Sequence, residues 1–153
     1  MVYFFDTSAL VKRYHREPGT EVVDDAFDDL GTDCVISDLG IVEFYSAFAK
    51  KVRVGELPGN RFETLIQAFG KDVRTDTIQV LSLDDEDKRS AVSLIETYGI
   101  SQSLRTLDAM QLAVMRSLGP DQITTVYCAD RQFVEVIERD GFSVVNPETV
   151  DAS

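Results

Sequence analysis

Apolar and polar positions along this chain form two kinds of run. Short, mostly apolar runs cover 2–5, 34–36, 77–83, 124–129 and 142–145, and the run at 2–5 shows no alternation. Such runs are typical of strands that are buried on both faces of a parallel sheet. The segments between them place apolar residues every three or four positions, which is the period of an amphipathic helix.

The first expected helix begins with Ala9 and Leu10. The next three are expected over 20–30, over 38–53 and through 62–69. Three more follow: one that opens with the acids at 84–87, one over 103–118 and one over 131–139. The acids at 84–87 lie in a first helical turn, where the helix dipole favours them, and are assigned to stability. Strands that alternate with helices predict a three-layer α/β sandwich with a central parallel sheet.

Length and composition favour one domain over residues 1–153, because 153 residues with 44% hydrophobic residues are typical of one compact core. No apolar run approaches the roughly 18 to 20 residues of a membrane span, and the N-terminus lacks a signal-type segment. We therefore expect a soluble, cytoplasmic protein with no membrane partner. Cys34 and Cys128 lie in apolar strands without CxxC spacing, so they are expected as reduced core residues.

The net charge of -12, from 27 acidic and 15 basic residues, argues against simple electrostatic attraction to nucleic acid. An anionic ligand would need local charge compensation. Asp outnumbers Glu and Arg outnumbers Lys, a bias that fits a salt-rich cytoplasm or GC-rich coding equally well.

Several common α/β sites are excluded by their missing residues. The chain has no glycine-rich phosphate loop, no GxSxG elbow, and no second aspartate after Asp6 to make a DxD motif. His15 is the one histidine, and it is expected on the surface of the first helix. Carboxylates are the remaining candidates for chemistry.

Two aspartates end apolar strands. Asp6 follows the strand at 2–5, and Thr7 and Ser8 after it can cap the next helix. Ligands of open α/β sheets bind at this carboxyl end of the strands. Asp130 has the same placement, which also suits an ordinary N-cap.

Asp108 lies on the expected helix over 103–118, inside its apolar arc when each residue advances 100°. That arc contains Leu104, Leu107, Met110, Leu112, Val114, Met115 and Leu118. A buried acid needs a partner or a cation. In the first turn after a Thr106 cap, however, the same acid would stabilise the helix dipole, and the pattern leaves both interpretations open.

Glu43 gives a weaker signal on the expected helix over 38–53. It shares a stripe with small and polar residues, opposite the apolar arc. Periodicity alone therefore predicts an ordinary exposed glutamate, although small neighbours would also suit a cleft.

The three aspartates together suggest one convergent site. Carboxylates that are brought together repel and raise one another's pKa unless a cation binds among them. Oxygen ligands without a cysteine or histidine cluster favour a hard cation, Mg²⁺ or Mn²⁺. Such a site supports phosphoryl chemistry, because the metal polarises a phosphate oxygen and lowers the pKa of a bound water.

Four segments, in order, resemble the motifs of a PIN domain, and most closely those of the VapC-type toxin ribonucleases. They are Asp-Thr-Ser-Ala-Leu-Val-Lys at 6–12, Ser-Asp-Leu-Gly-Ile-Val-Glu-Phe at 37–44, Leu-Asp-Ala-Met-Gln-Leu-Ala at 107–113 and Ala-Asp-Arg-Gln-Phe at 129–133. The resemblance spans about the whole chain.

This resemblance implies an acidic Mg²⁺ site in which Mn²⁺ can substitute. Carried over position by position, its catalytic and metal-binding residues are Asp6, Glu43, Asp108 and Asp130. Thr7 or Ser8 would assist through a hydroxyl or backbone contact near the metal. VapC-like proteins often carry Thr or Ser two residues before the last aspartate, where this chain has Cys128, so a supporting hydroxyl contact is in question while the metal site is not.

The implied activity is that of an endoribonuclease toxin of a type II toxin-antitoxin pair, in which a metal-activated water attacks an RNA phosphodiester in line. The resemblance also implies a homodimer and a small antitoxin partner whose C-terminal segment occupies the cleft, often through a basic residue. The acidic balance of this chain fits a basic partner segment.

RNA contact would require local positive charge. The candidates are Lys12, Arg13, Arg16, Lys50, Arg105 and Arg131. Arg105 and Arg131 are favoured because each lies near a proposed ligand in sequence, and solubility explains most of the others. Tyr14, Phe44 and Tyr45 could stack on bases, although aromatic residues at helical spacing more often belong to a core.

Two alternatives stay open at this point. One is a PIN-fold protein whose catalytic site has decayed and that acts as a binding or regulatory module, with Cys128 and the strong acidity as hints. The other is an acidic pocket like that of a response regulator, which accepts phosphate on an aspartate. The sequence shows no well-placed lysine after a late strand to support it.

Overall fold

A computed structural model describes residues 1–150 of the chain. Strands and helices alternate along most of it. The strands are β1 (Val2–Phe5), β2 (Asp33–Ser37), β3 (Gln79–Leu81), β4 (Thr125–Tyr127) and β5 (Val144–Val145). The helices are α1 (Thr7–Tyr14), α2 (Thr20–Asp28), α3 (Asp38–Arg53), α4 (Gly59–Arg74), α5 (Asp85–Tyr98), α6 (Thr106–Leu118) and α7 (Arg131–Arg139).

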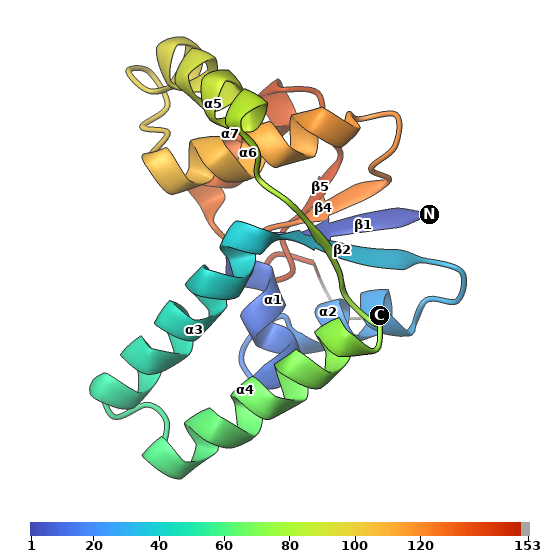
Figure 1. Ribbon diagram of the computed structural model, residues 1–153, viewed down its shortest axis with the longest axis vertical. Coiled ribbons are helices and arrows are strands. Elements are labelled where there is room, and N and C mark those ends of the chain that lie inside the picture. Colours follow the sequence, from blue (N-terminus) through green and yellow to red (C-terminus); the bar gives the residue numbers. More distant parts are fainter. Residues whose placement is uncertain (151–153) are drawn as a thin grey trace.

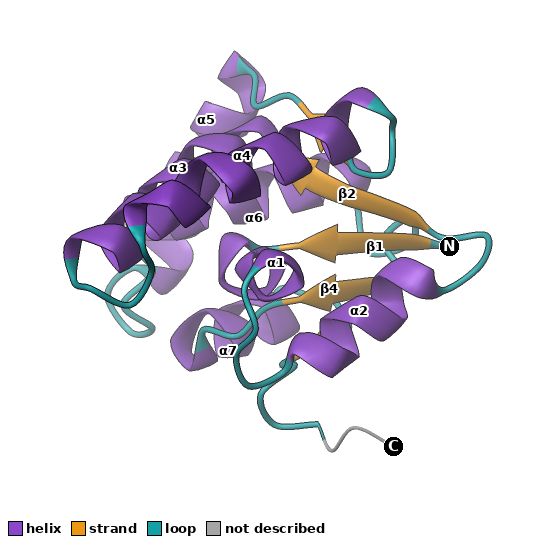
Figure 2. Cartoon of the chain, turned by 90° about the horizontal axis from the view of Figure 1, so that it is seen from below, coloured by secondary structure: helices purple, strands orange, loops and turns teal. Residues whose placement is uncertain are grey.

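The five strands form one parallel sheet in the order β3-β2-β1-β4-β5. The central strand β1 pairs with β2 on one side and with β4 on the other, so that Phe5 lies opposite Tyr127. Figure 2 shows these three strands side by side with their arrows in one direction. The strand order changes direction at β1, and ligands of open α/β sheets bind at such switch points.

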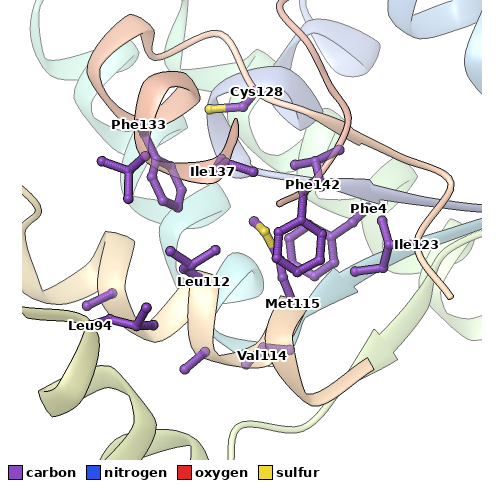
Figure 3. Packing of buried hydrophobic residues seen from close by; sticks show 14 of the residues in the cluster. Phe4, Leu94, Leu112, Val114, Met115, Ile123, Cys128, Phe133, Ile137 and Phe142 are labelled. Atoms are coloured by element: carbon purple, nitrogen blue, oxygen red, sulfur yellow. The ribbon is translucent and has the colours of Figure 1, made fainter. Parts of the chain in front are cut away.

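Both faces of the sheet are covered, because neighbouring residues of a strand point to opposite sides. Phe4 belongs to a core cluster with residues of α5, α6 and α7, and Figure 3 shows Phe4, Leu112 and Ile137 in that cluster. Phe5 belongs to the cluster on the other face, built with residues of α1, α2, α3 and α4. The predicted three-layer α/β sandwich with a parallel sheet is confirmed (Figure 1).

Several element ends differ from those predicted. The first helix begins at Thr7 rather than Ala9, because the Asp6 side chain caps it. The helix predicted over 103–118 begins at Thr106, since Ser103 has a left-handed backbone with φ of 55°. The helix predicted to reach Leu30 ends at Asp28, and Leu30 is 94% exposed.

The segment after β5 folds back onto the region between α1 and α2. Gly19 has φ of 91°, and a Cβ atom there would lie 2.8 Å from the carbonyl oxygen of Pro147. Lys12, only 2% exposed, pairs through Nζ with Glu17 Oε1 at 2.9 Å and Glu148 Oε1 at 2.7 Å. Lys12 was one of the candidate RNA contacts. Because its ammonium is buried and paired with two glutamates, it is not available to RNA.

Two further features concern the remaining expectations. Cys34 and Cys128 are free and buried, as predicted. Within residues 1–150, none of the helices is both long enough and apolar enough to cross a bilayer.

Candidate functional site

A cleft of about 610 Å³ lies at the carboxyl ends of β1 and β4 and contains all four candidate acids. In Figure 1 the arrowheads of β1 and β2 point toward the starts of α1 and α3. The cleft is lined by Asp6, Thr7, Ser8, Val11, Leu39, Val42, Glu43, Ser46, Ala47, Lys50, Arg105, Leu107, Asp108 and Asp130. The fold thus brings together residues from four separate sequence segments.

Asp6 is almost completely buried, at 7% exposure. Its Oδ2 accepts hydrogen bonds from the Ser8 backbone N at 3.2 Å and from Ser8 Oγ at 2.6 Å. Cys128 Sγ donates to the same oxygen at 3.7 Å, and Ser8 Oγ accepts from the Ala129 backbone N at 2.9 Å. Asp6 is both the cap of α1 and a group fixed to the end of β4, and its Oδ1 takes no part in these contacts.

Asp108 and Asp130 share Arg105 as a neighbour. Arg105 Nε lies 3.8 Å from Asp108 Oδ2, and another guanidinium nitrogen of Arg105 lies 3.8 Å from Asp130 Oδ2. Asp130 Oδ1 accepts from the backbone N of Gln132 and Phe133, so Asp130 caps α7 as well. The expected N-cap role of Asp130 is confirmed through Oδ1, while Oδ2 faces Arg105 and the cleft.

Glu43 is half-buried, so the exposure that periodicity predicted for it is wrong. Its Oε1 accepts a hydrogen bond from Gln111 Nε2 at 2.7 Å and one from Thr7 Oγ1 at 3.4 Å. Periodicity failed here because the side chains of Thr7 from α1 and Gln111 from α6 reach Glu43 from outside its own helix.

The electrostatics of the cleft disfavour negative charge. Burial raises the pKa of the Asp6 carboxyl, despite hydrogen bonds that lower it. Burial also raises the pKa of Glu43 and of Asp108, and the charge of Asp6 raises both further. Arg105 opposes the rise at Asp108 without cancelling it. The acids therefore affect one another, and a cation among them would relieve both burial and repulsion.

The donor set fits a hard cation, while the present spacing permits few direct ligands. Across residues 1–150, no group of three or more Asp, Glu, His or Cys side chains is close enough to hold a metal ion. Mg²⁺ usually keeps several waters and binds through one or two carboxylates, so a direct three-ligand cage is not required. The cleft therefore offers one or two carboxylate ligands to an ion that keeps the rest of its water shell.

The other candidate contacts divide between cleft, surface and core. Lys50 and Arg105 line the cleft, and Arg131 is exposed at the start of α7. Among the three aromatic candidates only Tyr45 is exposed. Phe44 is fully buried, and Tyr14 is partly buried with its hydroxyl bonded to Asp72. His15 follows α1 as its C-cap and is half-buried rather than a surface residue of that helix.

A second cleft, of about 550 Å³, lies beside α5 and α6, away from the strand ends. Three of its four acids have structural partners: Asp84 and Asp87 form a capping box, and Asp140 binds Arg116 Nε at 2.8 Å. The predicted stabilising role of the acids at the start of α5 agrees with this capping. We therefore place the candidate chemistry in the first cleft.

One buried polar residue at the site, Gln111, was missed from the sequence. Gln111 is 1% exposed and contacts both Glu43 and Ser37, the N-cap of α3. At 100° per residue Gln111 falls nearer the middle of the apolar arc of its helix than Asp108 does. The place of Gln111 in this arc is therefore a sequence signal of the same kind as that of Asp108.

Sequence comparison shows the family. The PIN domain model matches residues 3–139, so the chain belongs to the PIN domain family. The response-regulator alternative is thereby replaced, and the resemblance to PIN domains is confirmed. No protein of curated function matches the chain significantly.

Solved structures share the fold at low sequence identity. FitAcB from Neisseria gonorrhoeae matches with a TM-score of 0.70 and 16% identity, over 98% of this chain and 100% of that one. VapC20 from Mycobacterium tuberculosis, described as a Sarcin-Ricin loop cleaving toxin, has a TM-score of 0.67 and 16% identity, over 94% and 97%. A toxin-antitoxin complex from Klebsiella pneumoniae has a TM-score of 0.63 and 17% identity, over 95% and 97%.

Proposed function

We propose that this chain is a metal-dependent endoribonuclease, the VapC-type toxin of a type II toxin-antitoxin pair. The observation that carries the proposal is the convergence of Asp6, Glu43, Asp108 and Asp130 in one cleft of a PIN domain. The similar VapC20 is described as a toxin that cleaves the Sarcin-Ricin loop, an RNA substrate, which supports the same class of reaction.

The four acids would hold Mg²⁺, or Mn²⁺ in its place, with Thr7 and Ser8 in support. A bound ion would supply a polarised phosphate oxygen and a water of lowered pKa. Ser8 fixes Asp6 through its hydroxyl and backbone N, which leaves Asp6 Oδ1 for the ion. Cys128 contacts Asp6 through its thiol, the position at which the family often carries a hydroxyl.

The chain's own cations would orient the RNA. Arg105 and Lys50 line the cleft, and Arg131 lies exposed beside Asp130. Arg105 is 77% exposed and reaches two carboxylates only at 3.8 Å, so its guanidinium is free to turn toward a phosphate. These residues would supply local positive charge at the cleft, which RNA binding requires because the net charge of the chain is -12.

The proposed partner is a small antitoxin with a basic segment. Leu39, Val42 and Leu107 line the same cleft as the acids, so a segment with apolar and basic side chains matches its surface. Several structural neighbours are toxin-antitoxin complexes, including that from Klebsiella pneumoniae. We propose a homodimer and a cytoplasmic location for this chain on the same family grounds, with one domain over 1–153.

A second candidate function is a PIN-fold binding module without catalysis. The observations that favour it are the thiol of Cys128 beside Asp6 and the spacing of the acids, no three of which within residues 1–150 form a ready metal cage. Mg²⁺ titration by calorimetry separates the two functions, because a decayed site should not bind the ion.

Cleavage of RNA by the purified protein in Mg²⁺ tests the proposal. EDTA should abolish cleavage, and Asp6→Asn should abolish it as well. Asp25→Asn is the matched control, because Asp25 is exposed on α2, away from the cleft. Cleavage that survives both EDTA and Asp6→Asn would exclude the metal mechanism at this site.

A further inference from the structure

We propose that Gln111 is a positioning residue that holds the Glu43 carboxylate in the acidic cleft. The inference rests on the proposed function, since it concerns one of the acids assigned there. It stands on the buried hydrogen bonds that join α6, α3 and the end of β2.

The Gln111 amide has a partner at each end. Its Nε2 donates to Glu43 Oε1 at 2.7 Å, and its Oε1 accepts from Ser37 Oγ at 2.7 Å. Gln111 is 1% exposed and Ser37 is fully buried, so water does not compete for these groups. A buried amide that makes both bonds is well satisfied, whereas an unpaired end would cost free energy.

Ser37 satisfies the end of the Gln111 amide that faces away from Glu43. The Ser37 hydroxyl accepts from the backbone N of Gly40 at 3.2 Å as the cap of α3. It donates its own proton to Gln111 Oε1 at 2.7 Å, which satisfies the oxygen of the amide. The Gln111 NH₂ group then faces Glu43, where it requires an acceptor.

A carboxylate matches that requirement, and Thr7 Oγ1 adds a second donor to the same oxygen at 3.4 Å. Both bonds use Glu43 Oε1, so Oε2 is the oxygen left for a ligand in the cleft. Asp108 lies one helical turn before Gln111 on α6. The Gln111 bond consequently fixes Glu43 of α3 relative to Asp108 of α6.

The test compares crystal structures and Mn²⁺ affinities of the parent protein and Gln111→Met, which keeps the side-chain length and removes both hydrogen bonds. Thr20→Val is the matched control: Thr20 is buried, and its hydroxyl also makes two hydrogen bonds, to Lys12 O and from Glu17 N, away from the cleft. Ser37→Ala is a second variant that removes the partner of Gln111 Oε1 together with the side-chain cap of α3, while the Gln111–Glu43 bond can remain.

We expect Glu43 to leave its parent orientation in Gln111→Met, and Mn²⁺ to bind about 10- to 100-fold more weakly by calorimetry. Ser37→Ala should show a smaller change in the same direction, and Thr20→Val should bind Mn²⁺ like the parent at a similarly reduced melting temperature. If Gln111→Met does not fold, Gln111→Leu, which also removes both hydrogen bonds, decides the question by the same two measurements.

Glu43 in its parent orientation after the Gln111 bond is lost would overturn the inference, even if affinity fell. A displaced Glu43 with unchanged Mn²⁺ affinity would support positioning and remove Glu43 from the metal site. If the parent bound no Mn²⁺, the proposed function would fail, while the Glu43 orientation in the two crystal structures would still decide the role of Gln111.

Discussion

Replacement of Lys12 by methionine should destabilise the protein without changing its affinity for RNA. The ammonium of Lys12 joins α1 to Glu17, in the segment before α2, and to Glu148, in the segment after β5. Methionine matches the length of the lysine stem but removes both ion pairs. The free energy of unfolding should therefore fall.

The size of the loss follows from what remains around each acid. A hydrogen bond to a charged group contributes about 1.5–3 kcal/mol, and removal of the buried lysine also removes its desolvation cost. Glu17 keeps Lys51 at 3.2 Å, and Glu148 is 45% exposed, so neither acid is left buried and unpaired. We expect a loss of about 2 kcal/mol, which lowers the melting temperature by about 4–8 °C for a chain of this size.

The loss should also depend on pH. Burial raises the pKa of the Glu17 carboxyl, but the bonds and charges of Lys12 and Lys51 outweigh burial and lower it. A carboxyl with a lowered pKa stabilises the folded state above its unfolded pKa, and that stabilisation disappears as pH falls through the folded pKa. The deficit of Lys12→Met should therefore shrink once pH falls below about 4.

Scanning calorimetry of Lys12→Met and Lys50→Met measures the effect, since Lys50 is exposed and lines the cleft. Lys50→Met should melt like the parent and bind RNA more weakly. A Lys12→Met protein that melts like the parent but loses RNA affinity would refute the structural role of Lys12.

Asp108→Asn should lose RNA cleavage. Without metal it should nevertheless melt at or above the parent's temperature, because burial and the charges of Asp6 and Asp130 raise the pKa of Asp108. A raised carboxyl pKa favours folding at low pH, and this advantage is lost as pH rises through the folded pKa. The gain in stability of the variant over the parent should therefore grow from about pH 4 upward. A large loss of stability in thermal melts would instead favour the capping role of Asp108. Cys34 and Cys128 should react with a thiol reagent at pH 8 only after unfolding, because both are buried and burial raises the pKa of Cys34 to about 11; rapid reaction of either in the native protein would contradict the described core. Cys128→Ser should retain cleavage at the parent's level or above, since a hydroxyl can also donate to Asp6, and a loss of cleavage would show that the thiol is required.

Much of the fold was predictable because its strands are buried on both faces. Val35 and Ile36 are neighbours in β2, yet they enter opposite core clusters, so an unbroken apolar run was the correct signal for a strand in a parallel sheet. The element ends were less predictable. Leu30 satisfies the apolar period of its helix, but the helix ends at Asp28 and no core residue covers Leu30.

The site was predictable only where local sequence fixes the position of an acid. Asp6 and Asp130 follow strands, so their place at one edge of the sheet could be read from the chain. The surroundings of Glu43 depend on side chains of α1 and α6, which are far from α3 in sequence and which single-helix periodicity does not describe. The pairing of Lys12 with Glu148 is a long-range contact of the same kind.

Calorimetric titration of Mn²⁺ into the parent protein and four single variants tests the central claim most directly. The variants are Asp6→Asn, Glu43→Gln, Asp108→Asn and Asp130→Asn, with Asp25→Asn as the control. We predict saturable binding to the parent and to the control, and weaker binding in each of the four variants. A parent that binds no Mn²⁺, or four variants that bind it as tightly as the control, would contradict a shared metal site.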